Sequence, residues 1–401
     1  MTKEQEFTMR WFREYYSGAE IAGPTEIEHR EFGFMYFDKD FVRRHVGFKR
    51  PEDLRKYLSS QVPMHVYYSS ALYDAPSAPK MEMKGWKGAD LVFDLDADHI
   101  KGAGSMSYSE MLALVKKDMI RLLDDFLFGD MGFGEEDVRI VFSGGRGYHA
   151  HISDKKVLSL RSHERSEIVD YVSGTDLDLD WVFPQSAAMK KEFKTHTKVE
   201  KAVAVPESGA GGWRGHARRA LEQLFDELRF MEPDGVKKRF PVLSKYKDQV
   251  VLGLHKELFG ERPGDMLGYQ LILANNSLEY VSDRYKEALL DLVRSEVRPR
   301  VAAEVDEPVT RDIKRLIRLP GSLHGKTGMR VIEMRRDQLT DFEPLRDAFP
   351  DIYPDDVVKV QVSSPVDVAL KGVRFRGDGE MELPIYAALF MILRMRASLV
   401  P

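Results

Sequence analysis

Two spacings of hydrophobic residues divide the first 155 positions into expected helices and strands. Apolar residues three or four positions apart share one face of a helix, and this spacing occurs in "TMRWFREYYS" (8–17), after Pro51, and over 111–126. Short apolar or alternating runs predict strands in "HVYYSSALY" (65–73), "LVFDLD" (91–96) and on both sides of a glycine-rich turn in "VRIVFSGGRGYHAHI" (138–152). The order strand, helix, strand, turn, strand predicts an α/β nucleus.

The pattern changes between about 155 and 300. Charged amphipathic helices dominate there, as in "HARRALEQLFDELRFM" and "SDRYKEALLDLVRSEV", and strand signals are sparse. Strand-like runs return at 329–334 and 356–362, and an apolar helix is predicted over 385–400. We therefore expect an α/β (α+β) fold with a discontinuous core formed by 1–155 and 300–401, interrupted by a mostly helical subdomain at 156–299.

The amino-acid composition excludes several classes of protein. The 401 residues are 43% hydrophobic, which is enough for a sizeable core, and no apolar run approaches the roughly 20 residues of a membrane span. Cysteine is absent, which excludes disulfides and thiolate zinc sites, and the charged start is unlike a signal peptide. Because the net charge is −5, any binding to nucleic acid must come from local basic clusters. We expect a cytoplasmic protein without a membrane partner.

Three aspartates end the apolar run at 91–93. A strand places Asp94, Asp96 and Asp98 on one face, where like charges repel. Such carboxylates either form the polar end of a strand or bind hard divalent cations such as Mg²⁺. Spacing alone does not decide, because "TDLDLDW" (175–181) repeats it without an apolar lead-in strand; we interpret that second set as structural.

Two further clusters carry groups suited to phosphate. "SGGRGYHAH" places Ser143, Arg146 and His149 around a glycine-rich turn, which is either an ordinary hairpin or a phosphate site. In 305–331, Asp306 precedes Pro308, and a helix is predicted to carry a basic face up to Arg318. Pro320-Gly321 then precede a loop with His324 and Lys326. A basic run is usually a solvated helix face, but this one ends in a loop suited to anions.

Together the three clusters resemble the catalytic small subunit of archaeal and eukaryotic DNA primases. The shared pattern is a strand ending in Asp-x-Asp, then Ser-Gly-x-Arg-Gly-x-His, then an aspartate followed by "RLPGSLHGKTG" (318–328), which favours the archaeal branch. Upstream, "REFGF" (30–34), "RRHVGF" (43–48) and "VYYSSALY" (66–73) are similar to N-terminal blocks of that family.

The resemblance implies a primase that makes short primers on single-stranded DNA for replication, by two-metal nucleotidyl transfer with Mg²⁺ or Mn²⁺. Its implied metal ligands and catalytic residues are Asp94, Asp96 and Asp306. Its implied nucleotide-binding residues are Ser143, Arg146, His149, Arg318, His324 and, in the "RRH" block, Arg44. Its implied partners are ribonucleoside triphosphates, with deoxyribonucleotides left open, single-stranded DNA and a large subunit in a heterodimer.

The sequence departs from the family pattern in one respect, and three alternative functions stay open. Relatives commonly carry a cysteine zinc knuckle after the aspartate pair, whereas "HIKGAGSMSYSE" (99–110) offers only His99 and Glu110, so we expect no zinc. A repair or gap-filling polymerase of the same superfamily is one alternative. An inactive single-strand-binding subunit of the replication machinery is another. On the aspartates alone, a nuclease or a different nucleotidyltransferase also stays open.

Overall fold

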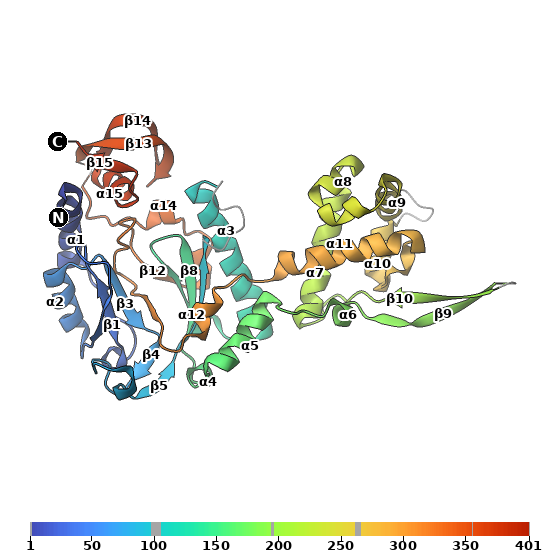
Figure 1. Ribbon diagram of the computed structural model, residues 1–401, viewed down its shortest axis with the longest axis horizontal. Coiled ribbons are helices and arrows are strands. Elements are labelled where there is room, and N and C mark those ends of the chain that lie inside the picture. The colour runs from blue at the N-terminus through green and yellow to red at the C-terminus, as the bar shows by residue number, and fades with distance from the viewer. Residues whose placement is uncertain (1, 98–105, 194–195, 261–265, 355, 401) are drawn as a thin grey trace. The chain divides into compact units, whose positions relative to one another are not determined.

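The computed structural model describes residues 2–97, 106–193, 196–260, 266–354 and 356–400 (Figure 1). The chain forms two compact units. Unit 1 comprises Met1–Asp124, Gly132–Val169 and Glu304–Pro401, and unit 2 comprises Asp125–Met131 and Asp170–Ala303. Unit 1 is therefore built from three separate stretches of the chain.

The first sheet of unit 1 joins the N-terminal strands to a strand from far along the chain. Its strand order is β11 (Leu316–Arg318), β3 (His65–Ser69), β1 (Phe32–Met35), β2 (Arg43–Val46), all antiparallel. Helices α1 (Lys3–Gly18) and α2 (Pro51–Gln61) lie beside it (Figure 1) and confirm the two helices predicted from spacing. Phe12, Leu54 and Phe34 meet in the core between these helices and the sheet.

The second sheet of unit 1 carries the aspartate strand. Its order is β12 (Ile332–Met334), β7 (Val138–Phe142), β8 (Gly147–Ile152), β6 (Leu91–Asp96), again antiparallel. Helix α3 (Tyr108–Arg121) contacts β6 and β8, and it begins with the capping box formed by Ser107 and Glu110. The predicted strand–helix–strand–turn–strand order is confirmed, and the mixture of helices with antiparallel sheets gives the expected α+β class.

Shorter elements complete unit 1. β4 (Ala71–Tyr73) pairs with β5 (Trp86–Ala89), and a third sheet has the order β14 (Val373–Pro384), β13 (Val357–Leu370), β15 (Ala397–Leu399). The remaining helices are α4 (Lys155–Leu158), α12 (Glu307–Arg311), α13 (Arg336–Leu339), α14 (Pro344–Asp347) and α15 (Ile385–Leu393). Helix α5 (Ser162–Ser173) leads from unit 1 into unit 2, and the π-helical segment Leu122–Asp130 follows α3.

Unit 2 is mainly helical. Its helices are α6 (Leu179–Val182), α7 (Gly212–Arg229), α8 (Pro233–Arg239), α9 (Asp248–Phe259), α10 (Gly268–Asn275) and α11 (Asp283–Val301). Unit 2 also contains a hairpin of β9 (Gln185–Phe193) and β10 (His196–Val203), which the sparse strand signals of this region did not predict. The second aspartate set is structural as predicted, because Asp178 caps α6 by accepting from the N–H groups of Asp180 and Trp181.

Three predicted elements were wrong. The helix expected up to Arg318 ends at Arg311, where the side chain of Asp312 accepts from the Lys314 N–H and turns the chain into β11. The single strand expected over 65–73 breaks at Ser70 into β3 and β4 of different sheets. The helix expected over 385–400 ends at Leu393, and β15 pairs with β13. In each case, pairing with residues distant in sequence overrides a local pattern.

A buried polar cluster fixes the break at Ser70. The Arg30 guanidinium donates to the carbonyls of Ser69 and Ser70 and lies 2.8 Å from a carboxylate oxygen of Asp90. Both side chains of this ion pair are about 1% exposed. Arg165 donates to the backbone oxygens of Ala89 and Asp90. The two arginines therefore supply side-chain donors to carbonyls at the ends of the interrupted strands, and the Ser70 carbonyl also accepts from the Asp90 N–H.

Among the described residues, no helix is both long and apolar enough to cross a membrane.

Candidate active site

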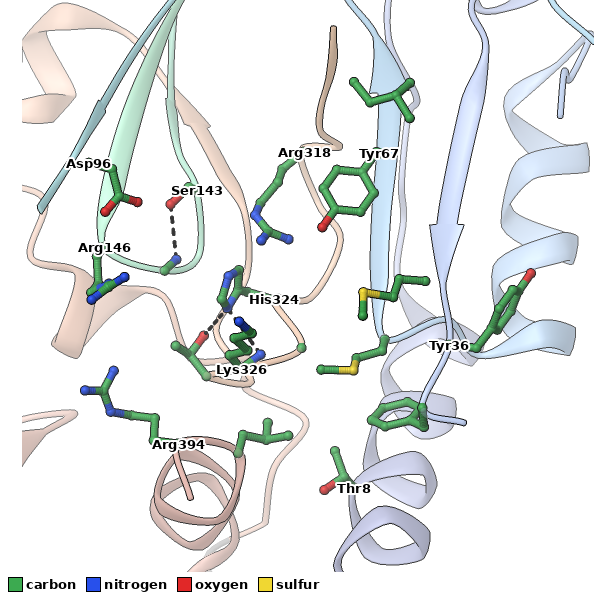
Figure 2. A pocket seen from close by; sticks show the side chains of 18 of the residues that line it. Thr8, Tyr36, Tyr67, Asp96, Ser143, Arg146, Arg318, His324, Lys326 and Arg394 are labelled. Atoms are coloured by element: carbon green, nitrogen blue, oxygen red, sulfur yellow. Dashed lines mark hydrogen bonds between the residues drawn. The ribbon is translucent and has the colours of Figure 1, made fainter. Parts of the chain in front are cut away.

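A cavity of about 1070 Å³ opens in unit 1 between the two sheets that carry the sequence motifs. Seven of the predicted residues line it: Asp94, Asp96, Ser143, Arg146, His149, Arg318 and His324. Figure 2 shows Arg318 and His324 between the turn that carries Ser143 and the strand that carries Tyr67. The fold thus brings residues from three separated stretches of sequence into one cavity.

The pairing of β6 with β8 sets the position of the carboxylates. Asp94 lies opposite His149, and Asp96 lies opposite Gly147. The His149 Nε2 atom is 3.4 Å from Asp94 Oδ1. A Cβ atom at position 147 would lie 2.6 Å from the Leu95 carbonyl oxygen and 3.2 Å from Asp96 Oδ2, so glycine is required for this close approach.

Asp306 reaches the same strand through its backbone. Its N–H donates to the Asp94 carbonyl oxygen at 2.8 Å. Burial raises the pKa of Asp94; His149 opposes this change, and the charges of Asp96 and Asp306 add to it. A site that disfavours its own carboxylate charge in this way favours the binding of a cation, which stabilises the ionised form.

The Ser143 hydroxyl shapes the glycine-rich turn. Its Oγ accepts from the N–H groups of Gly145 and Gly147, both at 3.3 Å, and the side chain keeps its own proton to donate. Gly144 has φ +73°, and a Cβ there would lie 2.7 Å from the Cβ of His324. Only glycine combines this left-handed backbone with such a close approach, so the turn and the His324 loop fit against each other.

The loop from His324 to Thr327 is tied to that turn. The Thr327 hydroxyl donates to the Gly144 carbonyl oxygen at 2.5 Å. The Lys326 N–H donates to His324 Nδ1 at 3.3 Å, and Nδ1 also lies 3.2 Å from the Thr327 Oγ1 atom. His324 is buried, and the tautomer in which Nδ1 accepts from Lys326 places a donor at Nε2.

Arg318 is held in place by the first sheet. β11 pairs with β3 so that Arg318 lies opposite Tyr67, and the guanidinium is 5.2 Å from the centre of the Tyr67 ring. The Arg318 Nη1 atom donates to His65 Nδ1 at 2.7 Å. Burial lowers the pKa of Arg318, while Tyr67 and Asp94 oppose that change. A guanidinium stays charged in such a site, so the cavity contains a half-buried cation near two carboxylates.

Arg44 is the predicted nucleotide-binding residue that lies away from the cavity wall. It lies on β2 and forms a bidentate pair with the buried carboxylate of Glu31, at 3.1 Å for each contact. It is not among the residues that line the cavity. Asp98 and His99 lie outside the described residues. The expectation that no zinc is bound therefore stays a prediction.

The donor set fits a hard cation, although no complete cage is preformed. Within the described ranges, no group of three or more His, Cys, Asp or Glu side chains is arranged to hold a metal. Asp94 and Asp96 nevertheless share a strand face at the cavity wall, and Asp306 is bonded to that strand. Carboxylate oxygens are the ligands that Mg²⁺ and Mn²⁺ prefer.

Tyr67, Tyr108, Lys326 and Arg394 also line the cavity, although the family resemblance assigns none of them a role. Residues two positions apart in a strand lie on one face, so the sequence alone could indicate that His65 and Tyr67 point the same way. Lys326 belongs to the loop that the sequence indicates for anions. Nothing local identifies Arg394, because it follows an apolar helix and reaches the cavity only through the fold.

His65 gives a test of this buried arrangement through pH. Burial, followed by the charges of Arg318 and Lys326, lowers the pKa of His65 from 6.5 to about 2. Between these values the unfolded chain binds one proton more than the folded chain, so stability falls as pH falls below about 6.5. This histidine should contribute a slope of about 1.4 kcal/mol per pH unit.

The matched variant is His65→Asn, whose amide oxygen can still accept from the Gly325 N–H that now donates to His65 Nδ1. We measure the free energy of unfolding in urea at pH 7, 6 and 5. We expect it to fall less steeply with decreasing pH in the variant than in the wild type, by the contribution of one proton. His163→Asn is the control, because that ring is exposed to water in the folded protein. Equal slopes for wild type and His65→Asn would contradict a buried neutral His65.

Comparisons with known proteins agree with these motifs. The family described as DNA primase small subunit matches residues 93–336. The chain is 42% identical to the DNA primase small subunit PriS of Methanococcoides burtonii over 396 residues, which cover 97% of each chain. It is 38% identical to that of Methanocella arvoryzae, covering 98% of each chain. It is 40% identical to that of Methanothrix thermoacetophila, covering 96% of this chain and 95% of the relative.

Proposed function

Because the chain belongs to the DNA primase small subunit family, a family of nucleotidyltransferases, we propose that it synthesises short primers on single-stranded DNA for replication. The observation that carries this proposal is the register of β6 against β8. It sets the carboxylates of Asp94 and Asp96 at the wall of the cavity that also contains Arg146, Arg318 and His324. Carboxylates facing cations in one cavity suit a metal-bound triphosphate better than an uncharged ligand.

The cationic side of the cavity is proposed to bind the triphosphate. Arg318 and Arg146 offer planar forks that match phosphate oxygens, and His324 offers its Nε2–H. Ser143 can donate its hydroxyl proton next to the backbone turn that it already organises. These groups are fixed before the ligand binds, so they can stabilise the charge that develops during phosphoryl transfer without reorganising.

The carboxylate side is proposed to hold Mg²⁺ or Mn²⁺ on Asp94 and Asp96, with Asp306 as the third carboxylate. Bound there, divalent cations would lower the pKa of the attacking hydroxyl and neutralise the leaving pyrophosphate. His149, 3.4 Å from Asp94, orients that carboxylate toward the cavity. Phosphoryl transfer depends mainly on such positioning and electrostatics.

The family also implies partners. Small subunits are named for a larger one, so we propose a heterodimer with a primase large subunit, acting on a DNA template. We propose ribonucleoside triphosphates as the substrates. The proposed template and role support a cytoplasmic, nucleoid-associated location.

The test is primer synthesis without a primer. The chain is incubated with unprimed single-stranded DNA, labelled ribonucleotides and Mg²⁺ or Mn²⁺, with and without a primase large subunit. Short labelled products that disappear when EDTA removes the metal would support the proposal. Extension of a supplied primer, with no initiation even beside the large subunit, would favour a gap-filling polymerase. No incorporation in either format would contradict a catalytic role.

A further inference from the structure

The segment that follows α15 places a cation in the cavity that none of the sequence motifs contains. Arg394 lines the cavity, as does Arg146 of the glycine-rich turn. Figure 2 shows their guanidinium groups pointing toward one another on the same side of the pocket. Among the described residues, no carboxylate forms an ion pair with Arg394. Arg394 therefore adds a second guanidinium to the side of the cavity that Arg146 lines, and guanidinium groups match the geometry of phosphate oxygens.

Aromatic contacts hold Arg394 in this position. Its guanidinium lies 4.1 Å from the centre of the Tyr108 ring and 5.2 Å from that of Phe390. The Tyr108 hydroxyl donates to the Gly145 carbonyl oxygen at 2.6 Å. Tyr108 therefore connects Arg394 to the turn that carries Arg146, so that the two cations keep a fixed relation to each other.

Burial supports the same conclusion. It lowers the pKa of Arg394; the Tyr108 hydroxyl opposes this change, and the positive charge of Arg146 adds to it. The next arginine along the chain, Arg396, is exposed. A long cationic side chain normally extends into water, so the inward course of Arg394 needs a compensating anion.

We propose that Arg394 is a phosphate-binding residue of this cavity, which together with Arg146 holds the β- and γ-phosphates of the bound nucleoside triphosphate, and that Tyr108 is its positioning residue. This inference rests on the proposed function, since it adds a residue to the same triphosphate site. We favour phosphates of the nucleotide over those of the DNA backbone. Arg146 lies on the turn that leads into β8, and β8 pairs with β6, the strand that carries Asp94 and Asp96. A triphosphate whose metal is held by those aspartates would reach that point.

The test is equilibrium binding, which does not require primer synthesis. ATP, ADP and AMP are titrated with Mg²⁺ against the wild type, Arg394→Gln, Arg394→Lys and the neighbouring control Arg396→Gln. We expect Arg394→Gln to weaken ATP binding about 10- to 100-fold and AMP binding less than about 2-fold. Arg394→Lys should recover part of the loss, and Arg396→Gln should bind like the wild type. Equal thermal midpoints would exclude a folding defect.

Three outcomes would overturn the inference: unchanged ATP affinity in Arg394→Gln, an equal loss for ATP and AMP, or a loss confined to single-stranded DNA. The positioning role has its own readout. Tyr108→Leu should reduce the difference between ATP and AMP affinity, and Tyr108→Phe, which keeps the ring against Arg394 but loses the bond to Gly145, should retain part of that difference. Selective loss of ATP binding in a chain whose wild type makes no primers would support this inference and contradict the proposed function. A wild type that binds no ATP would contradict both.

Discussion

Replacing Asp94 and Asp96 together by asparagine is expected to lower nucleotide incorporation at least about 1,000-fold without unfolding the protein. Asparagine keeps the size of each side chain but removes the charge that a divalent cation requires. Because burial already raises the pKa of Asp94, removing this charge should not lower the thermal midpoint. The measurement is incorporation of labelled ribonucleotides on single-stranded DNA, with Mg²⁺ and Mn²⁺ titrated for each variant.

The chain contains a matched control for this experiment. Asp176 and Asp178 have the same spacing, but Asp178 caps α6 in unit 2. Asparagine also caps helices and accepts left-handed backbone, which Asp176 adopts at φ 53°. Asp176→Asn/Asp178→Asn should therefore keep both stability and incorporation. If the Asp94/Asp96 variant retained activity within about tenfold of the wild type, or the control lost as much, the proposed metal ligands would be wrong.

Replacing Arg30 by methionine is expected to destabilise the protein by about 3–5 kcal/mol, the largest effect on stability that we predict. The change leaves the Asp90 carboxylate buried without its cation and removes the donors to two strand-end carbonyls. Folded domains are stable by only about 5–15 kcal/mol, so the urea midpoint should fall sharply. Circular dichroism during urea unfolding measures this shift.

The control is an ion pair of similar geometry in water. Arg374 contacts Asp367 through both carboxylate oxygens, at 2.7 and 2.8 Å, and these side chains are 69% and 42% exposed. Arg374→Met should leave the urea midpoint at the wild-type value. Arg30→Met/Asp90→Asn should recover part of the loss, because the unpaired charge is gone. A midpoint for Arg30→Met equal to that of Arg374→Met would show that burial of the Arg30–Asp90 pair contributes nothing.

Local patterns in the sequence determine much of this protein. The strand that ends in Asp94 and Asp96, the glycine-rich hairpin around Arg146 and the helices at 3–18 and 51–61 all follow from side-chain periodicity and from residues that cap or turn the chain. These features depend on neighbours within a few residues. The order of the three motifs along the chain is also enough to indicate the family.

Only the tertiary structure decided how those pieces meet. Arg318 lies on a strand instead of the predicted helix because β11 pairs with β3, about 250 residues earlier in the chain. That pairing gives Arg318 its contacts with His65 and Tyr67. Arg44 is likewise placed by a tertiary contact, its pair with buried Glu31. Arg394 enters the cavity only because α15 packs near the start of α3. The sequence determines which groups are available at each position, whereas contacts between distant residues determine which of them share a cavity.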